Sequence, residues 1–139
     1  MPVTCATETK SISPIATKRS YMVYMPAVLV AAGIAVLSLL EKQHVPPVGT
    51  SDKLAHGLSY AVLAGCLMGA LLYRGRRSWR WILLAIVSTT AYGLLMEVLQ
   101  RFCTLTRSGE VADLTADLIG AVIGVTITLI ISRCLPSTT

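Results

Sequence analysis

The stretch EVADLTADLIGAVIGVTITLIIS (residues 110–132) combines a long hydrophobic run with charge. Its last 15 residues, 118–132, carry no charge and are mostly aliphatic, whereas three carboxylates stand within its first eight positions. An uncharged run of this kind indicates a membrane helix, and charge beside hydrocarbon is expensive, so a chain that places it there usually uses it. The stretch therefore predicts a membrane helix whose beginning is a candidate functional position.

The rest of the chain has the same character. Of its 139 residues, 54% are hydrophobic and 14% are charged, against about 25% charged in soluble domains. Uncharged runs cover residues 21–40, 57–73, 81–96 and 118–132. Only the first reaches the roughly 20 residues that a bilayer crossing needs, so the others must extend into polar neighbours. The sequence predicts an all-α four-helix transmembrane bundle over residues 21–133, with a disordered cytoplasmic tail at 1–20 and a short cytoplasmic tail at 134–139.

The first run could also be a cleaved signal peptide, since Lys18 and Arg19 precede it. It is longer than a typical signal core, however, and no convincing small-x-small cleavage site precedes Glu41. We expect an uncleaved helix that packs against or anchors the others.

The basic residues predict the orientation. With the N-terminus inside, eight lie in the cytoplasm and four outside, so the positive-inside rule places both termini in the cytoplasm. The net charge of +5 mostly reflects this topology, and we expect no nucleic-acid partner. The eight are Lys10, Lys18, Arg19, Arg74, Arg76, Arg77, Arg80 and Arg133; the four are Lys42, Lys53, Arg101 and Arg107.

The cysteines fit this orientation. Cys5 and Cys134 fall inside, Cys66 lies within the second span, and only Cys103 falls outside. Because no two share the oxidising side, we predict no intramolecular disulfide.

Five of the seven acidic residues lie at related helix ends: Asp52, Glu97, Glu110, Asp113 and Asp117. Consecutive spans run in opposite directions. The start of the second helix, the end of the third and the start of the fourth therefore share one membrane face. The sequence thus marks the outer face as the functional one.

The last helix carries its polar residues on one side. Asp113, Asp117, Gly120 and Gly124 are spaced at i, i+4, i+7 and i+11, which keeps them on a narrow face. The two glycines allow a neighbouring helix to approach closely. This face should therefore turn toward another helix.

The second and third helices each carry a similar stripe. Gly93, Glu97 and Gln100 share one face of the third helix, where Gly93 is a further packing position. Ionisable groups in spans normally point into the bundle, so the stripes should face one another. The stripe on the second helix contains Asp52, His56, Ser59 and Tyr60.

Each candidate also has a purely structural interpretation. Asp52 and Glu110 are explained by helix capping alone. Glu97 lies near a helix C-terminus, where negative charge is disfavoured, so it needs a partner such as Arg101 or Arg107.

His56 is either a hydrogen-bonded structural residue or a ligand, and both interpretations stay open. Asp117 lies beyond any capping position, which favours a functional role. We predict a polar site in which His56, Glu97, Arg107, Asp113 and Asp117 converge near the outer boundary, with Asp52 and Gln100 at its rim. We assign no metal ligand, and the cofactor, if any, is unknown.

In these residues the chain resembles the VanZ-like family of small membrane proteins. The resemblance covers roughly residues 50–125 and departs at Asp117, where the family pattern usually has Asn. It implies a protein of the bacterial cytoplasmic (inner) membrane with a role in the cell envelope; the family is named for a protein associated with low-level resistance to teicoplanin. The matching elements are Asp52-Lys53-Leu54-Ala55-His56 with Tyr60, Tyr92-Gly93 through Glu97-Val98-Leu99-Gln100, and Arg107 followed by Asp113-Leu114, Asp117, Gly120 and Gly124.

Three functions fit this pattern. The favoured one is a non-enzymatic envelope factor that binds a lipid headgroup, glycolipid, cell-wall precursor or glycopeptide. The second is a membrane-embedded enzyme acting on a lipid or envelope substrate; in a metal-dependent form its oxygen-rich site would suit magnesium, calcium or manganese. The third is a subunit of an ion-coupled transporter, which would have to oligomerise because four helices rarely enclose a pathway. Membrane lipids are partners in every case.

Overall fold

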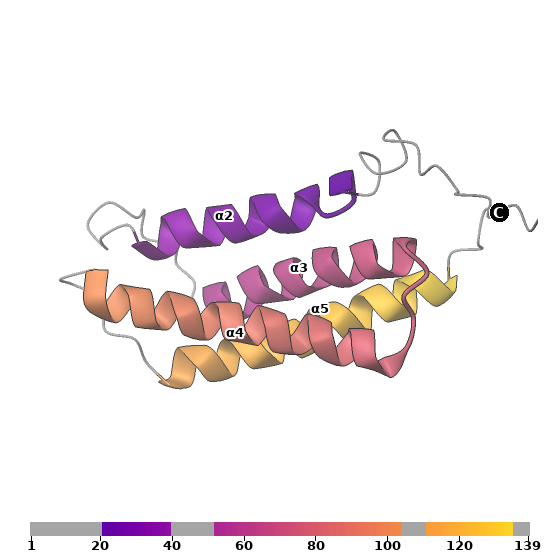
Figure 1. Ribbon diagram of the computed structural model, residues 1–139. Coiled ribbons are helices and arrows are strands. Elements are labelled where there is room, and N and C mark those ends of the chain that lie inside the picture. Colours follow the sequence, from indigo (N-terminus) through magenta and orange to yellow (C-terminus); the bar gives the residue numbers. More distant parts are fainter. Residues whose placement is uncertain (1–20, 40–51, 104–110, 135–139) are drawn as a thin grey trace, which may run out of the picture.

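The computed structural model describes residues 21–39, 52–103 and 111–134, and the side chains of Asp52, Cys103 and Val111 lie outside this description. The described residues form four helices and no strand: α2 (Met25–Leu39), α3 (Asp52–Tyr73), α4 (Trp79–Cys103) and α5 (Val111–Cys134). The helices lie along one another and alternate in direction (Figure 1). The predicted all-α bundle of four helices is confirmed, while the predicted tails lie outside the described residues except for Cys134.

Three helices are long and apolar enough to cross a membrane: Lys53–Tyr73, Trp79–Phe102 and Ala112–Cys134. The fourth, α2, has 15 residues and is therefore about 22 Å long, less than the roughly 30 Å hydrocarbon core. The uncharged run begins at Tyr21, and a turn at Val23 and Tyr24 interrupts it before α2. Pro26 explains the turn, since its ring is tolerated in the first turn of a helix but clashes inside one.

The basic turn between α3 and α4 ends α3 with a glycine cap. Gly75 has a φ of 72°, in the left-handed region that glycine adopts without strain. The amide of Gly75 donates to the carbonyl of Leu72, and that of Arg76 donates to the carbonyl of Leu71, both at 2.9 Å. This pair of bonds is a Schellman motif, which satisfies the last carbonyls of α3 and lets the chain reverse at once.

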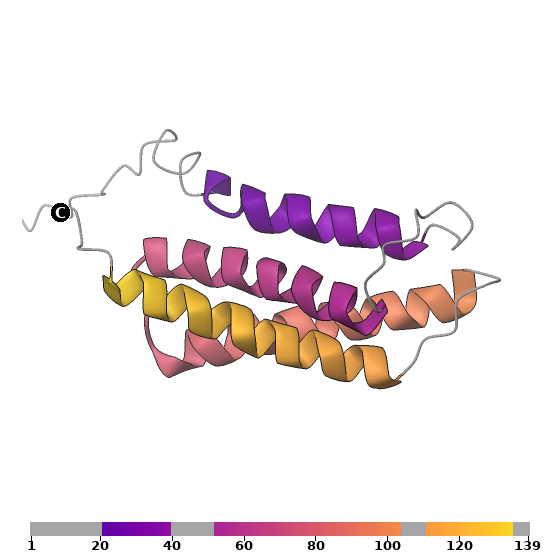
Figure 2. The same ribbon diagram turned by 180° about the vertical axis from the view of Figure 1, so that it is seen from behind.

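Helices α3 and α5 run in the same direction and pack most extensively (Figure 2). Small residues allow this close approach. A Cβ added at Gly120 would overlap the backbone of Gly57, and one added at Gly124 would overlap the backbone of Ala61. One turn further on, a Cβ added at Gly65 would lie 3.5 Å from the carbonyl oxygen of Gly124. The two α5 glycines, which were predicted to let a helix approach closely, thus pack against the small-residue face of α3.

Away from the end where α3 and α5 begin, the described interior of the bundle is mostly apolar, with Thr89 as a buried polar residue. Ala64, Met68, Ala85, Ala121 and Val125 are buried where α3, α4 and α5 meet. A second buried cluster connects α2 to α3 and α4. Large hydrophobic side chains are instead exposed on the outer faces of the helices, as expected for surfaces that contact lipid; they include Leu58, Val62, Leu84, Ile123 and Ile130.

Candidate functional site

The described candidate residues lie at one end of the bundle, where α2 and α4 finish and α3 and α5 begin (Figure 1). We call this the polar end. His56 lies in the second turn of α3, Glu97 lies near the end of α4, and Asp117 lies two turns into α5. The alternating helix directions place these three positions at the same level of the bundle.

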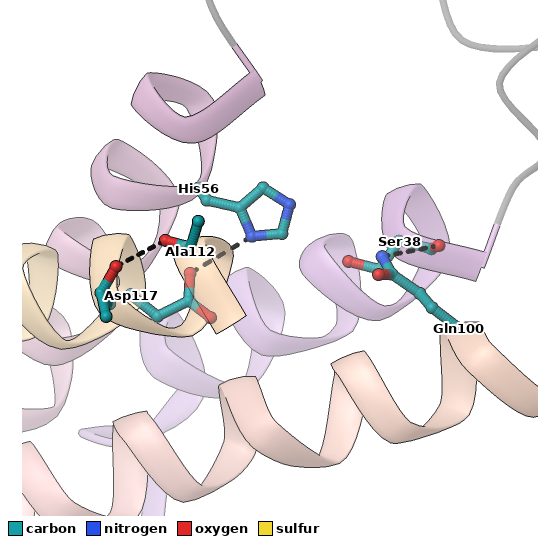
Figure 3. A network of polar contacts seen from close by, with 6 residues as sticks. Ser38, His56, Gln100, Ala112 and Asp117 are labelled. Carbon is teal, nitrogen blue, oxygen red and sulfur yellow. Dashed lines mark hydrogen bonds and ion pairs between the residues drawn. The ribbon is translucent and has the colours of Figure 1, made fainter. Parts of the chain in front are cut away.

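His56 and Asp117 form the central contact. The Nδ1 atom of His56 lies 3.2 Å from Oδ1 of Asp117, and the two side chains are 14% and 0% exposed (Figure 3). The contact joins α3 to α5 directly beside their glycine-lined interface. His56 is therefore oriented by a fully buried carboxylate, an arrangement that fixes which imidazole nitrogen faces outward.

The second oxygen of Asp117 is accommodated by Gly93 on α4. A Cβ at Gly93 would overlap Oδ2 of Asp117 and would lie 3.2 Å from Cε1 of Tyr60. This Oδ2 atom is buried and has no hydrogen-bond partner among the described residues. Buried carboxylate oxygens nearly always have a partner, so we expect a hydrogen-bond donor or a cation next to this Oδ2 atom.

Glu97 completes a cluster of three. It is 7% exposed and follows Gly93 by one turn of α4. One ligating atom each from His56, Glu97 and Asp117 can be chosen so that all three lie within 4.8 Å of one another. We refer to these residues as the His–Glu–Asp cluster.

Two tyrosines support the cluster from the interior of the bundle. The ring of Tyr60, 1% exposed, stacks against His56 with centroids 6.4 Å apart and planes at 12°. Tyr92 lies 6.4 Å from Tyr60, and its hydroxyl donates a 2.7 Å hydrogen bond to the carbonyl of Ala31 on α2. The aromatic side chains thus restrict the rotation of His56 and connect its surroundings to α2.

Gln100 also contacts α2. Its Nε2 donates to the carbonyl of Ser38 at 3.1 Å, and the residue is 3% exposed. Figure 3 shows this contact beside the His56–Asp117 pair, not within it. Gln100, predicted at the rim of the site, is thus buried and fastens the end of α2 to α4.

The structure brings together His56, Glu97 and Asp117. Asp113 is partly buried in the first turn of α5, one turn before Asp117, and is not a member of the cluster. Asp52 is the first residue of α3, but its side chain lies outside the described residues. The same is true of Arg107, the predicted counter-charge, and of Glu110.

The first helix was expected to pack against or anchor the others, but its hydrogen bonds to α4 could not be predicted from its residues. Its links to α4 use the backbone carbonyls of Ala31 and Ser38, which every residue type offers. On α4, Tyr92 and Gln100 are eight residues apart, which places them within about 80° of each other around the helix, so both can reach α2.

An apolar groove of about 230 Å³ lies between α2, α3 and α4. Its lining includes Tyr24, Ala31, Leu63, Thr89 and Tyr92, and none of the three cluster residues. The groove and the His–Glu–Asp cluster are therefore distinct features of the described bundle.

The electrostatics of the cluster limit its chemistry. Two buried carboxylates and one imidazole at the end of an apolar bundle need compensating positive charge or hydrogen-bond donors. Such a set can accept hydrogen bonds from hydroxyl or ammonium groups, ligate a cation, or carry out acid–base chemistry through His56.

The fold and the cluster define a small helical membrane protein with a buried acidic site at one end of its bundle. The model of the VanZ/LLP1 family matches residues 11–132. The chain belongs to this family, which confirms the predicted family. Comparison with curated proteins gave no match, and neither did comparison with solved structures.

Proposed function

We propose that this VanZ/LLP1 protein acts in the bacterial cell envelope and binds the polar head of an amphipathic molecule at its polar end. The ligand classes are a lipid headgroup, a lipid-linked cell-wall precursor and a glycopeptide. The observation that carries the proposal is the fully buried Asp117, whose Oδ2 atom has no hydrogen-bond partner among the described residues. A donor from a ligand would satisfy this atom.

The depth of the cluster supports a ligand at the membrane boundary. His56 is four residues beyond the first residue of α3, which is about 6 Å along the helix axis. A group at this depth is within reach of a molecule whose chain lies in the bilayer. The positive-inside distribution of charge would turn the polar end to the outer face of the cytoplasmic membrane, with both termini in the cytoplasm.

A binding assay on the purified protein tests the proposal. We would measure thermal unfolding in detergent with phosphatidylglycerol, a polyprenyl-linked disaccharide-peptide or teicoplanin. A ligand at about 100 times its Kd stabilises the folded state by about 2.7 kcal/mol, a shift of several degrees. The shift should disappear in Asp117→Asn and His56→Ala. It should persist in Thr126→Val, since Thr126 is exposed and bonds only the carbonyl of Val122 on its own helix. Equal shifts in all variants, or none with any of the three ligands, would refute the proposal.

A membrane-embedded enzyme is the second candidate function. The observation in its favour is the orientation of His56 by Asp117 at 3.2 Å, the relation that a general base has to its orienting carboxylate. Conversion of a bound ligand, followed by mass spectrometry and abolished by His56→Ala, would establish this role. Binding without turnover would leave the protein a non-enzymatic binder.

A further inference from the structure

We propose that the His–Glu–Asp cluster binds a divalent transition-metal ion, ligated by the imidazole of His56 and the carboxylates of Glu97 and Asp117. Each ligand comes from a different helix: α3, α4 and α5. The inference deepens the proposed function. It rests on that function only where the ligand head is said to occupy an open coordination position of the ion. The binding of the ion can be tested without any such ligand.

The distances fit a metal centre after small side-chain rotations. A tetrahedral ion with bonds of 2.0–2.1 Å holds its ligand atoms about 3.4 Å apart. His56 Nδ1 and Asp117 Oδ1 are 3.2 Å apart, and the ion would replace the proton of their hydrogen bond. The longest separation in the cluster is at most 4.8 Å, so it must shorten by at most about 1.4 Å, within the reach of a rotation about the Glu97 side chain.

Burial and charge favour an ion over water. The three residues are 14%, 7% and 0% exposed for His56, Glu97 and Asp117, so two carboxylates are largely removed from solvent. A divalent cation would neutralise both carboxylates in a region of low dielectric, where attraction between opposite charges is strong. A cluster of acidic groups on the protein surface differs, because water there already solvates the carboxylates.

The Oδ2 atom of Asp117 is an independent indication. It lies in a buried position with no hydrogen-bond partner among the described residues, against Gly93, where a side chain of any other type would overlap it. The fold therefore keeps a carboxylate oxygen buried and available beside an imidazole and a second carboxylate. A ligated cation would account for that arrangement.

The donor set selects the kind of ion. One imidazole nitrogen with two carboxylates suits Zn²⁺ or Mn²⁺ better than the all-oxygen preference of Mg²⁺ or Ca²⁺. Three protein ligands leave at least one coordination position open. That position would accept a hydroxyl or phosphate oxygen from the bound head, and the ion would remove the repulsion between an anionic head and the two carboxylates.

Titration with Co²⁺ tests the proposal on the full chain. The protein would be purified in detergent with EDTA, freed of chelator and titrated while the visible absorption of the ligated ion is recorded. We expect one Co²⁺ per chain, displaced by Zn²⁺ and not by Mg²⁺. Loss of an outer-shell group costs about 10–100-fold in affinity, so losing a direct ligand in Asp117→Asn or Glu97→Gln should cost at least about 100-fold.

Thr115→Val is the control, because Thr115 is exposed on α5 two residues before Asp117 and its hydroxyl bonds the carbonyl of Ala112 on its own helix. It should leave the affinity essentially unchanged. Circular dichroism and gel filtration would establish that each variant is folded, with His56→Gln as a third ligand variant if one is not. No stoichiometric Co²⁺ absorption, or an equal loss in Thr115→Val, would overturn the metal site. Ligand-induced stabilisation of the metal-free protein would in that case leave the head-binding function standing.

Discussion

Substitution of Gly120 by Ala should destabilise the bundle, because the small-residue interface between α3 and α5 has no room for a methyl group. The added Cβ would overlap the carbonyl oxygen of Gly57 and lie 2.9 Å from its carbonyl carbon. Ordinary van der Waals contact begins at 3.4 Å, so the helices would have to separate by at least about 0.5 Å. Backbone cannot rotate away as a side chain does, and overpacking costs about 1–3 kcal/mol. We expect a loss of about 2 kcal/mol in the free energy of unfolding.

Two glycine variants serve as controls. A Cβ at Gly33 would have no atom within 4 Å, and one at Gly69 would meet only Cγ2 of Thr128 at 4.0 Å. Alanine is the better helix former by up to about 1 kcal/mol, so Gly33→Ala and Gly69→Ala should match or exceed the wild type. The assay is reversible unfolding in mixed micelles with increasing SDS, followed by circular dichroism. If Gly120→Ala is as stable as Gly69→Ala, the inferred packing of α3 on α5 is wrong.

Two further predictions concern α2 and the orientation. Tyr92→Phe removes the 2.7 Å hydrogen bond to the Ala31 carbonyl. It should lower the free energy of unfolding by about 0.6–1 kcal/mol in the same assay, because hydrogen bonds between membrane helices contribute about this much. An unchanged free energy of unfolding would show that this bond does not hold α2. In intact cells, Cys103 should react with a membrane-impermeant thiol reagent, and Cys5 and Cys134 should react only after permeabilisation; labelling of Cys134 from outside would reverse the orientation.

Much of the fold is predictable because charge and chain-reversing residues delimit the helices. The uncharged run at residues 81–96 lies within the helix Trp79–Cys103, and the run at 118–132 lies within Val111–Cys134. In both, the hydrophobic run fixes the helix and flanking polar residues fix its ends only to within a few positions. The turn at Val23 and Tyr24 is the feature that the hydrophobic run did not indicate, although Pro26 lies within that run.

The cluster is predictable for a related reason. Helical periodicity places Gly93 with Glu97, and Asp117 with Gly120, and alternating directions bring those faces to one end. Periodicity does not say which two helices approach most closely. The spacing of Gly57, Ala61 and Gly65 is a usable signal only once their partner helix is known, since small residues also occur on faces without a close neighbour.

The most direct test of the site is an experimental density map of the protein purified from its native membrane in lipid nanodiscs. We predict non-protein density at the polar end, within coordination or hydrogen-bond distance of Asp117 Oδ2 and enclosed by His56 and Glu97. A map with Glu97 facing lipid, or with Asp117 Oδ2 satisfied by the protein's own donors and no further density beside it, would contradict the account.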